Sequence, residues 1–314
     1  MKDLKIIFMG TPDFAVAILA RLLKEKYTIV GVITAPDKPA GRGRKLNESA
    51  VKKFATKNNL TVLQPTNLKS TLFLEELKYL QADLQIIVAF RMLPEAVWNM
   101  PILGTFNLHA SLLPQYRGAA PINWAIINGE TKTGVSTFFL DDKIDTGAII
   151  LQTETDITSD ETVGVLHDKL MHSGSDLVIE TLKLIEADNV TTTIQPEKAT
   201  KSAYKIHTET CKINWNDSLD NIYNHIRGLN PYPAAWTNFI NNGKESKLKL
   251  FDVKKEIIDH SHEIGKIISD KKTLKVATKK GYLNILSLQL SGKKRMDTAS
   301  LLNGFSIKPD SKTD

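Results

Sequence analysis

Over its first two-thirds, the 314-residue sequence alternates short apolar runs with stretches of helical periodicity. Such alternation is typical of α/β domains, in which strands and helices follow one another along the chain. One run, residues 86–90, is apolar on both faces, as in a parallel sheet that helices cover on both sides. The predicted strands are residues 5–9, 29–34, 61–63, 84–90, 105–110, 135–140 and 148–152. The sequence therefore predicts a doubly wound, Rossmann-like α/β domain.

Two stretches of this region have the apolar spacing of amphipathic helices. The first follows the first strand, and one face of it carries Ala15, Ile18, Leu19, Leu22 and Leu23. We expect Thr11 to cap this helix ahead of Pro12 and Asp13. The second covers residues 160–187, and its stripe consists of Val163, Leu166, Leu170, Leu177 and Leu182.

The composition changes at residues 188–200, where three successive threonines precede Gln195, Pro196 and Glu197. We interpret residues 190–205 as a linker between a first domain, residues 1–189, and a second domain, residues 206–314. A short helix opens the second domain, with Leu219, Ile222, Tyr223 and Ile226 on one face. Closely spaced strand candidates follow at residues 235–240, 247–253, 265–269, 274–278 and 283–288. This spacing predicts a small OB-like β-barrel.

Charge is distributed unevenly between the two parts of the chain. Residues 1–200 hold 21 Lys and Arg against 23 Asp and Glu, whereas residues 201–314 hold 20 against 12. The net charges are therefore −2 and +8, within an overall net charge of +6. A basic C-terminal third fits a polyanionic partner such as nucleic acid, although a lysine-rich surface that only favours solubility explains it equally well.

Several absences exclude other classes of protein. Cys211 is the only cysteine, which excludes an intramolecular disulfide and a multi-cysteine zinc site and fits a reducing, cytoplasmic compartment. We find no metal-ligand spacing and no apolar run near the ~18–20 residues of a membrane span. The turn after the first strand contains only Gly10, and Pro12 lacks an N–H. This turn therefore lacks the three-glycine pattern of a dinucleotide site.

Polar residues that suit carbonyl chemistry lie at the end of the fifth predicted strand. Asn107 and His109 point to the same side of that strand, because side chains two residues apart share a face. An amide N–H beside an imidazole is a suitable pair of donors for a carbonyl oxygen that becomes an oxyanion. Asp145, in the loop after the next strand, is a candidate partner for His109. The alternative is a core histidine with a backbone partner and an unrelated aspartate in a turn.

These residues also carry a resemblance to a known family. The segments 10–14, 36–43, 107–147, 212–215 and 227–233 are similar to segments of the methionyl-tRNA formyltransferases. Within them, residues 111–114 and 116–121 closely match the folate-site signature of that family. The resemblance covers roughly residues 4–300, and its central segment is specific to folate-dependent formyl transfer.

The resemblance implies a formyltransferase domain followed by a barrel that helps to hold tRNA. It implies 10-formyltetrahydrofolate as donor, methionyl-initiator-tRNA as acceptor, no metal, and no obligate protein partner or membrane. Asn107 and His109 would stabilise the tetrahedral oxyanion, while Asp145 would favour protonated His109 and position a water that relays the proton. The implied folate-site residues are Phe90, Arg91, Met92, Leu93, Ser111, Leu112, Leu113 and Pro114.

Basic residues in two places are candidates for contact with tRNA. Residues 37–46 form a cationic loop with Arg42, Arg44 and Lys45, which suits an RNA backbone or unpaired bases, and the resemblance implies that Arg42 wedges into the acceptor stem. In the predicted barrel, Lys247 and Lys249 alternate with leucines, so both lysines lie on one strand face. The aromatic residues Trp215 and Trp236 stack on bases or, as is commoner, belong to the core.

Two other functions remain open on the sequence alone. Glycinamide ribonucleotide formyltransferases, formyltetrahydrofolate hydrolases and sugar-nucleotide formyltransferases use the same Asn-His-Asp chemistry. The cationic loop and the basic barrel argue against the first two classes. A non-catalytic RNA-binding protein is the other possibility, and the intact Asn107, His109 and Asp145 argue against it.

Overall fold

The computed structural model describes residues 4–40, 45–197 and 201–314. Its chain divides into two compact units, each made of several segments. The first unit comprises Met1–Gly118, Thr133–Thr155 and His167–Ser202, and the second comprises Ala119–Lys132, Asp156–Leu166 and Ala203–Asp314. The predicted division into residues 1–189, 190–205 and 206–314 follows chain order and stays a prediction.

A seven-stranded sheet forms the centre of the first unit, in the order β10-β9-β7-β6-β1-β2-β5. Its strands are β1 (Lys5–Gly10), β2 (Thr28–Ile33), β5 (Val62–Leu63), β6 (Leu84–Val88), β7 (Thr105–His109), β9 (Lys132–Phe139) and β10 (Ile149–Asp156). Five neighbouring strands, β5, β2, β1, β6 and β7, are parallel to one another, whereas β9 runs antiparallel to β7. The α/β prediction is therefore confirmed, but the sheet is mixed rather than wholly parallel.

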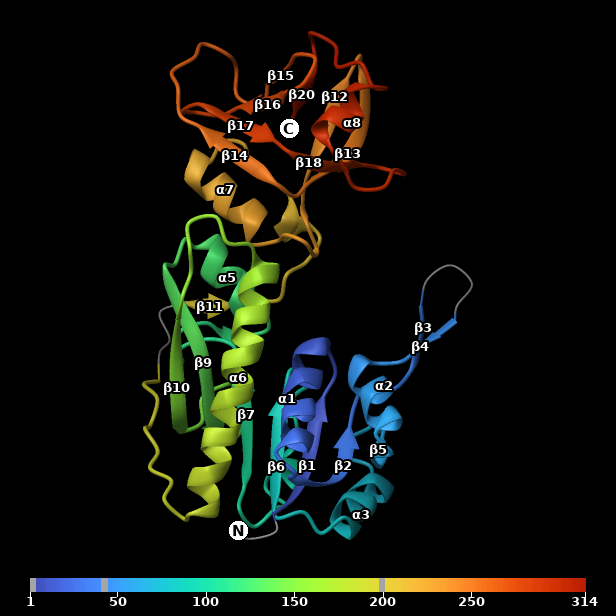
Figure 1. The fold of residues 1–314 in the computed structure, drawn as a ribbon, viewed down its shortest axis with the longest axis vertical. Helices are drawn as coiled ribbons and strands as arrows, with labels where there is room; N and C mark the ends of the chain where they lie inside the picture. The colour runs from blue at the N-terminus through green and yellow to red at the C-terminus, as the bar shows by residue number, and fades with distance from the viewer. Residues whose placement is uncertain (1–3, 41–44, 198–200) are drawn as a thin grey trace. The chain divides into compact units, whose positions relative to one another are not determined.

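Helices cover both faces of this sheet. They are α1 (Asp13–Lys24), α2 (Ala50–Lys57), α3 (Thr71–Tyr79), α4 (Glu95–Trp98) and α6 (Val163–Glu186). In Figure 1, α1 and α6 lie over one face, where Arg21 Nη1 of α1 is 2.6 Å from Asp176 Oδ1 of α6. On the other face, Ile7 and Met9 pack with residues of α3 and α4 in one apolar cluster. The alternation along β1 thus supplies apolar residues to both layers.

The helix stripes were predicted well, but the predicted cap of α1 was wrong. Pro12 itself takes the extended conformation at the cap position, and the helix begins at Asp13 without a side-chain cap from Thr11. By contrast, Ser49 caps α2 by accepting a hydrogen bond from Lys52 N.

A short hairpin extends the chain between β2 and α2. It consists of β3 (Lys38–Ala40) and β4 (Lys45–Asn47), which pair antiparallel and project beside α2 in Figure 1. The predicted loop at residues 37–46 therefore has strands at its base. Arg42 and Arg44 lie outside the described residues, as does the side chain of Lys45.

The second unit contains two antiparallel sheets and short helices. One sheet has the order β19-β18-β13-β12-β20 and the other β14-β17-β16-β15. The strands are β12 (Ala235–Asn241), β13 (Lys244–Leu250), β14 (Val253–Glu256), β15 (Ile267–Ser269), β16 (Leu274–Ala277), β17 (Tyr282–Ile285), β18 (Ser287–Leu290), β19 (Met296–Asp297) and β20 (Lys312–Thr313). Remaining elements of the chain are α5 (Pro121–Ile127), α7 (Leu219–Arg227), α8 (Thr298–Leu302), the 3-10 turn Glu209–Cys211, and the paired short strands β8 (Arg117–Gly118) and β11 (Ser202–Ala203).

Two strands predicted in the second domain are each divided in the structure. The strand expected at residues 247–253 becomes β13 and β14, and the one expected at residues 283–288 becomes β17 and β18. Asp252 O accepts hydrogen bonds from Leu286 N and Ser287 N, at 2.8 and 3.1 Å, at the break between the strand pairs. The helix stripe was correct, because Leu219, Ile222 and Ile226 of α7 all lie in the core.

Candidate active site

His109 ends β7, the strand that the sequence analysis singled out. Its side chain is buried, and Asn107, two residues earlier, lies on the same face. The intervening Leu108 points to the opposite face, where Gly174 of α6 lies so close that an added Cβ would meet Leu108 Cδ2 at 2.8 Å. The strand therefore presents an amide and an imidazole together.

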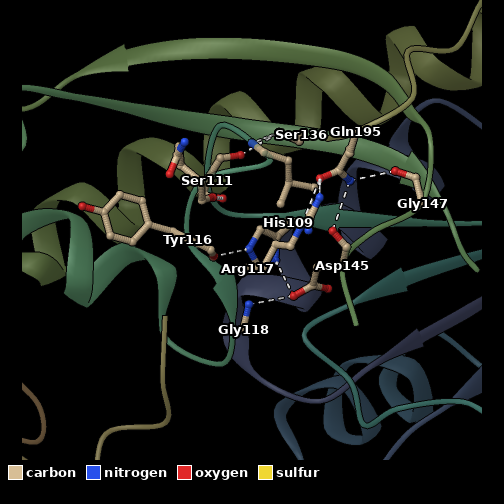
Figure 2. Close-up of polar contacts among 11 residues, drawn as sticks. His109, Ser111, Tyr116, Arg117, Gly118, Ser136, Asp145, Gly147 and Gln195 are labelled. Atoms are coloured by element: carbon tan, nitrogen blue, oxygen red, sulfur yellow. Dashed lines mark hydrogen bonds and ion pairs between the residues drawn. The ribbon is translucent and has the colours of Figure 1, made fainter. Parts of the chain in front are cut away.

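The hydrogen bond of His109 fixes which ring nitrogen carries a proton. Nε2 lies 2.9 Å from Tyr116 O, and Nδ1 lies 3.8 Å from Asp145 Oδ2 (Figure 2). Because a carbonyl oxygen only accepts, Nε2 is the donor. Nδ1 is thus the nitrogen that faces the carboxylate, and a proton there makes the ring an imidazolium beside a negative charge.

Asp145 lies in the loop between β9 and β10 and is held by the backbone opposite it. Its Oδ2 accepts a hydrogen bond of 2.8 Å from Gly118 N, and its side chain is only 13% exposed. Its φ is +55°, a left-handed conformation that aspartate tolerates better than most residues do. The predicted approach of Asp145 to His109 is therefore present in the structure.

The amide of Asn107 has unused hydrogen-bonding capacity. Its Oδ1 is buried and has no hydrogen-bond partner within the described part of the chain. A buried polar atom left unpaired costs ~1–3 kcal/mol. Because Asn107 shares a face with His109 and its unpaired Oδ1 accepts hydrogen bonds, this position suits a ligand that offers an N–H or O–H donor, as an amino group does.

The turn after β7 contains Ser111, Leu112, Leu113 and Pro114. Ser136 of β9 holds this turn through two hydrogen bonds. Leu113 N donates to Ser136 Oγ at 3.1 Å, and Ser136 Oγ donates to Ser111 O at 2.6 Å. Gln152 of β10 adds a hydrogen bond of 3.0 Å from Nε2 to Leu113 O. The side chains of Ser111 and Leu113 are buried, so this segment offers mainly its backbone and shape to a ligand.

The segment Phe90, Arg91, Met92 and Leu93 follows β6, at the same carboxyl edge of the sheet as His109. The strand order reverses between β1 and β6, and open α/β sheets bind ligands at such points. Arg91 donates hydrogen bonds to Pro65 O and Thr66 O, while Met92 is exposed and Leu93 is buried. Arg91 thus ties this segment to the backbone at residues 65–66.

The remaining predicted basic residues lie on β13 of the second unit. Leu248 and Leu250 are buried, whereas Lys247 is exposed, as the alternation predicted. Lys247 Nζ lies 3.6 Å from the centre of the Trp236 ring, and Lys249 Nζ donates to Pro233 O at 3.1 Å. Trp215 and Trp236 are both buried, in agreement with a role in the core.

Comparison with known proteins gives the family. The model "Formyl transferase" matches residues 4–182, and "Formyl transferase, C-terminal domain" matches residues 205–306. A methionyl-tRNA formyltransferase of Flavobacterium johnsoniae is 61% identical over 99% of both chains, and one of Bacteroides thetaiotaomicron is 52% identical over 98% of this chain and 97% of that protein. The chain belongs to the methionyl-tRNA formyltransferase family.

Solved structures agree with this family in fold. An N-formyltransferase from Helicobacter canadensis, in complex with folinic acid and dTDP-3-aminofucose, has a TM-score of 0.67 and is 20% identical. It covers 93% of this chain and 100% of its own. At that identity, the likeness supports the fold of this methionyl-tRNA formyltransferase family member and nothing finer.

Several residues around this candidate site were not predicted from the sequence. Gly118, Ser136 and Gln152 act through hydrogen bonds whose partners are far away along the chain, and Gln195 lies in the predicted linker. Ser136 lies on β9 and Gln152 on β10, so the register of these strands against their neighbours brings those two residues to the site. Among the residues that the structure describes, no three His, Cys, Asp or Glu side chains are arranged to hold a metal ion, and no helix has the length and apolarity to cross a membrane.

Proposed function

We propose that this enzyme transfers the formyl group of 10-formyltetrahydrofolate to the α-amino group of methionyl-initiator-tRNA. The observation that carries the proposal is the 61% identity, over nearly the whole of both chains, to a curated methionyl-tRNA formyltransferase. Two formyltransferases of known structure are more distant: the one from Helicobacter canadensis, in complex with dTDP-3-aminofucose, is 20% identical, and WlaRD, a sugar 3N-formyl transferase, is 21% identical. These identities favour a tRNA acceptor over a sugar nucleotide.

The proposed chemistry is direct attack of the amine on the formyl carbon. A new C–N bond forms, the bond to the folate nitrogen breaks, and the proton lost by the amine ends on that nitrogen. During attack the formyl oxygen becomes an oxyanion, which the Asn107 amide and the His109 ring stabilise as donors. Since His109 Nε2 donates its hydrogen bond to Tyr116 O, Nδ1 is the ring nitrogen that can donate to the oxyanion.

Asp145 supplies the charge that this role of His109 requires. Its carboxylate lies 3.8 Å from Nδ1 and places a negative charge beside the nitrogen that would donate to the oxyanion. A water beside the same carboxylate then relays the proton between the amine and the folate nitrogen. The folate itself would lie along the carboxyl edge of the sheet, against Phe90, Arg91, Met92 and Leu93 on one side and Ser111, Leu112, Leu113 and Pro114 on the other.

We assign contacts with the tRNA to Arg42, Arg44 and Lys45 of the basic segment 37–46 and to Lys247 and Lys249 of β13. Their support is charge, because residues 201–314 carry a net charge of +8 and segment 37–46 adds further cations. The proposal retains residues 1–189 as the catalytic domain, 190–205 as its connection and 206–314 as the tRNA-binding domain. It also retains a cytoplasmic location and needs no metal and no obligate protein partner.

An OB-like barrel for residues 206–314 is part of the proposal, and three connections support it. β13 continues into β14 after two residues, and β17 continues into β18 after one. β13 pairs with β18 while β14 pairs with β17, so both sheets share the same two chain segments. At the other edge, Ile267 N donates to Ser311 O at 3.0 Å and Thr313 N donates to Gly265 O at 2.8 Å, which links β15 to β20.

The acceptor is tested by offering labelled 10-formyltetrahydrofolate with four acceptors separately. They are methionyl-initiator-tRNA, methionyl-elongator-tRNA, glycinamide ribonucleotide and a dTDP-amino sugar, and water alone measures hydrolysis. We expect label to transfer to methionyl-initiator-tRNA at least 10-fold faster than to any other acceptor. Faster transfer to glycinamide ribonucleotide or the sugar nucleotide, or rapid hydrolysis in water alone, would contradict the proposal.

A further inference from the structure

The segment after α6, which the sequence presents as a linker, runs beside the catalytic loop of the first unit. Thr193 and Ile149 exchange both backbone hydrogen bonds, each 2.8 Å long, in an antiparallel bridge. In that register the sum of paired residue numbers is constant, so Gln195 lies opposite Gly147. Gln195 is buried although its neighbour Ile194 is 86% exposed, so the side chain points inward.

The Gln195 amide nitrogen donates hydrogen bonds to two backbone carbonyls of the loop that contains Asp145. Nε2 donates to Asp145 O at 3.1 Å and to Gly147 O at 2.7 Å (Figure 2). Gly147 packs so closely against β9 that an added Cβ would lie 1.7 Å from Phe139 O, so a larger residue would displace this part of the loop. One side chain therefore satisfies two carbonyls that flank Thr146.

The amide oxygen of Gln195 holds Arg117 at the same time. Oε1 accepts hydrogen bonds from Arg117 Nε at 3.1 Å and Nη2 at 2.8 Å. Arg117 also donates to Pro196 O and Glu197 O, so its guanidinium binds three successive residues of this segment. Arg117 immediately precedes Gly118, whose N–H binds Asp145 Oδ2.

We propose that Gln195 is a positioning residue for formyl transfer. It binds the backbone carbonyl of Asp145 directly. Through Arg117 it also positions Gly118, whose N–H donates to the Asp145 carboxylate. The inference rests on the catalytic role proposed for Asp145. Asp145 has a left-handed backbone, and such conformations persist only where the surroundings over-determine them. Gln195 supplies that constraint from a segment outside the matched formyl transferase region, residues 4–182.

The test uses two isosteric variants of the full chain, Gln195→Glu and Gln195→Met. The glutamate keeps an acceptor for Arg117 but removes the N–H donors to Asp145 O and Gly147 O, and the methionine removes both functions. Displacement of a catalytic group by ~1 Å costs up to about 100-fold in rate. We expect kcat for methionyl-tRNA formylation to fall about 10- to 100-fold in both variants, with KM for the tRNA within about 2-fold of wild type.

Gln289→Glu is the matched control, because Gln289 Nε2 also donates to a backbone carbonyl, Lys293 O at 2.8 Å, but on β18. Its kcat should equal that of the wild type. The decisive comparison is Asp145→Asn with and without Gln195→Glu. If Gln195 acts through Asp145, the second substitution lowers kcat by less than about 3-fold in the Asp145→Asn background.

An unchanged kcat in both folded Gln195 variants, or a full 10- to 100-fold loss on top of Asp145→Asn, would overturn the proposal. Thermal unfolding and tRNA binding of each variant identify any that fail to fold. If both Gln195 variants lose their fold, a purely structural role replaces the proposed one. An Asp145→Asn enzyme as fast as wild type would instead contradict the catalytic role of Asp145, so the two failures are distinguishable.

Discussion

At the scale of single residues, backbone groups decide what the titratable side chains do. The carbonyl of Tyr116 accepts a hydrogen bond from His109 Nε2, and the N–H of Gly118 donates one to a carboxylate oxygen of Asp145. Both bonds orient the side chains before any ligand binds, so Nδ1 of His109 meets the Asp145 carboxylate across 3.8 Å. Preorganisation of this kind makes electrostatic stabilisation of an oxyanion effective, because no reorganisation is required during the reaction.

At the scale of secondary-structure elements, the base of the β3–β4 hairpin is anchored at two points. Asp37 binds Lys52 of α2 through Oδ2 and accepts a hydrogen bond of 2.8 Å from Gln64 Nε2 through Oδ1. After β4, at the N-cap of α2, Ser49 Oγ lies 2.7 Å from the Oγ1 of Thr34, the residue that follows β2. The hydrogen bonds from Lys52 and Gln64 lower the pKa of Asp37, and those with Asp37 and Glu48 raise the pKa of Lys52.

This anchoring predicts that Lys52→Ala weakens the use of tRNA without slowing catalysis. If the hairpin binds tRNA as proposed, loss of its anchor should raise KM for methionyl-tRNA about 5- to 10-fold and leave kcat unchanged. Steady-state kinetics with varied tRNA measure both values. Lys53→Ala is the matched control, because Lys53 is an exposed neighbour with the same charge.

The anchor also has a pH dependence of known sign. Since the folded pKa of Asp37 is lowered, the ion pair is fully formed above the ordinary carboxyl pKa of ~3.9 and is lost as pH falls through the lowered value. The effect of Lys52→Ala on KM should therefore be constant between about pH 6 and 8. An equal rise in KM for Lys52→Ala and Lys53→Ala would mean that charge alone, and not anchoring, is responsible.

How well the elements were predicted depends on how local their determinants are. The stripes of α1, α6 and α7 and the apolar strands β1, β2 and β6 follow from spacing within a few residues. The strand breaks at Phe251–Asp252 and at Leu286 depend on hydrogen bonds between segments more than 30 residues apart. Asn107, His109 and Asp145 were predictable from strand period and family resemblance, whereas the inward position of Gln195 depends on the register of Thr193 against Ile149.

At the scale of the whole molecule, the charge asymmetry acquires a specific interpretation. Residues 1–200, which include the proposed catalytic residues, have a net charge of −2, and residues 201–314 have a net charge of +8. Basic residues that contact phosphates release counterions, so binding to tRNA should weaken steeply as salt increases. Lys247 of β13 is one exposed lysine among the described residues that fits this role.

Lys247→Gln should lower the slope of log affinity against log salt by about one, since one phosphate contact is lost. Lys247 is exposed, so its substitution removes no buried side chain. Filter binding or fluorescence titration with methionyl-tRNA at several salt concentrations measures the slope. Lys24→Gln, at the end of α1, is the control, and an identical slope for both variants would remove Lys247 from the interface.

The central claim is that Asn107, His109 and Asp145 carry out formyl transfer to methionyl-tRNA. Single-turnover formylation with saturating labelled 10-formyltetrahydrofolate tests it most directly, in the wild type, His109→Ala and Asp145→Asn. Loss of one group that stabilises an oxyanion costs about 100- to 1,000-fold in rate. We therefore expect each variant to be slower by at least about 100-fold while its affinity for methionyl-tRNA stays within about 2-fold. A rate within about 3-fold of the wild type in either folded variant would contradict the claim.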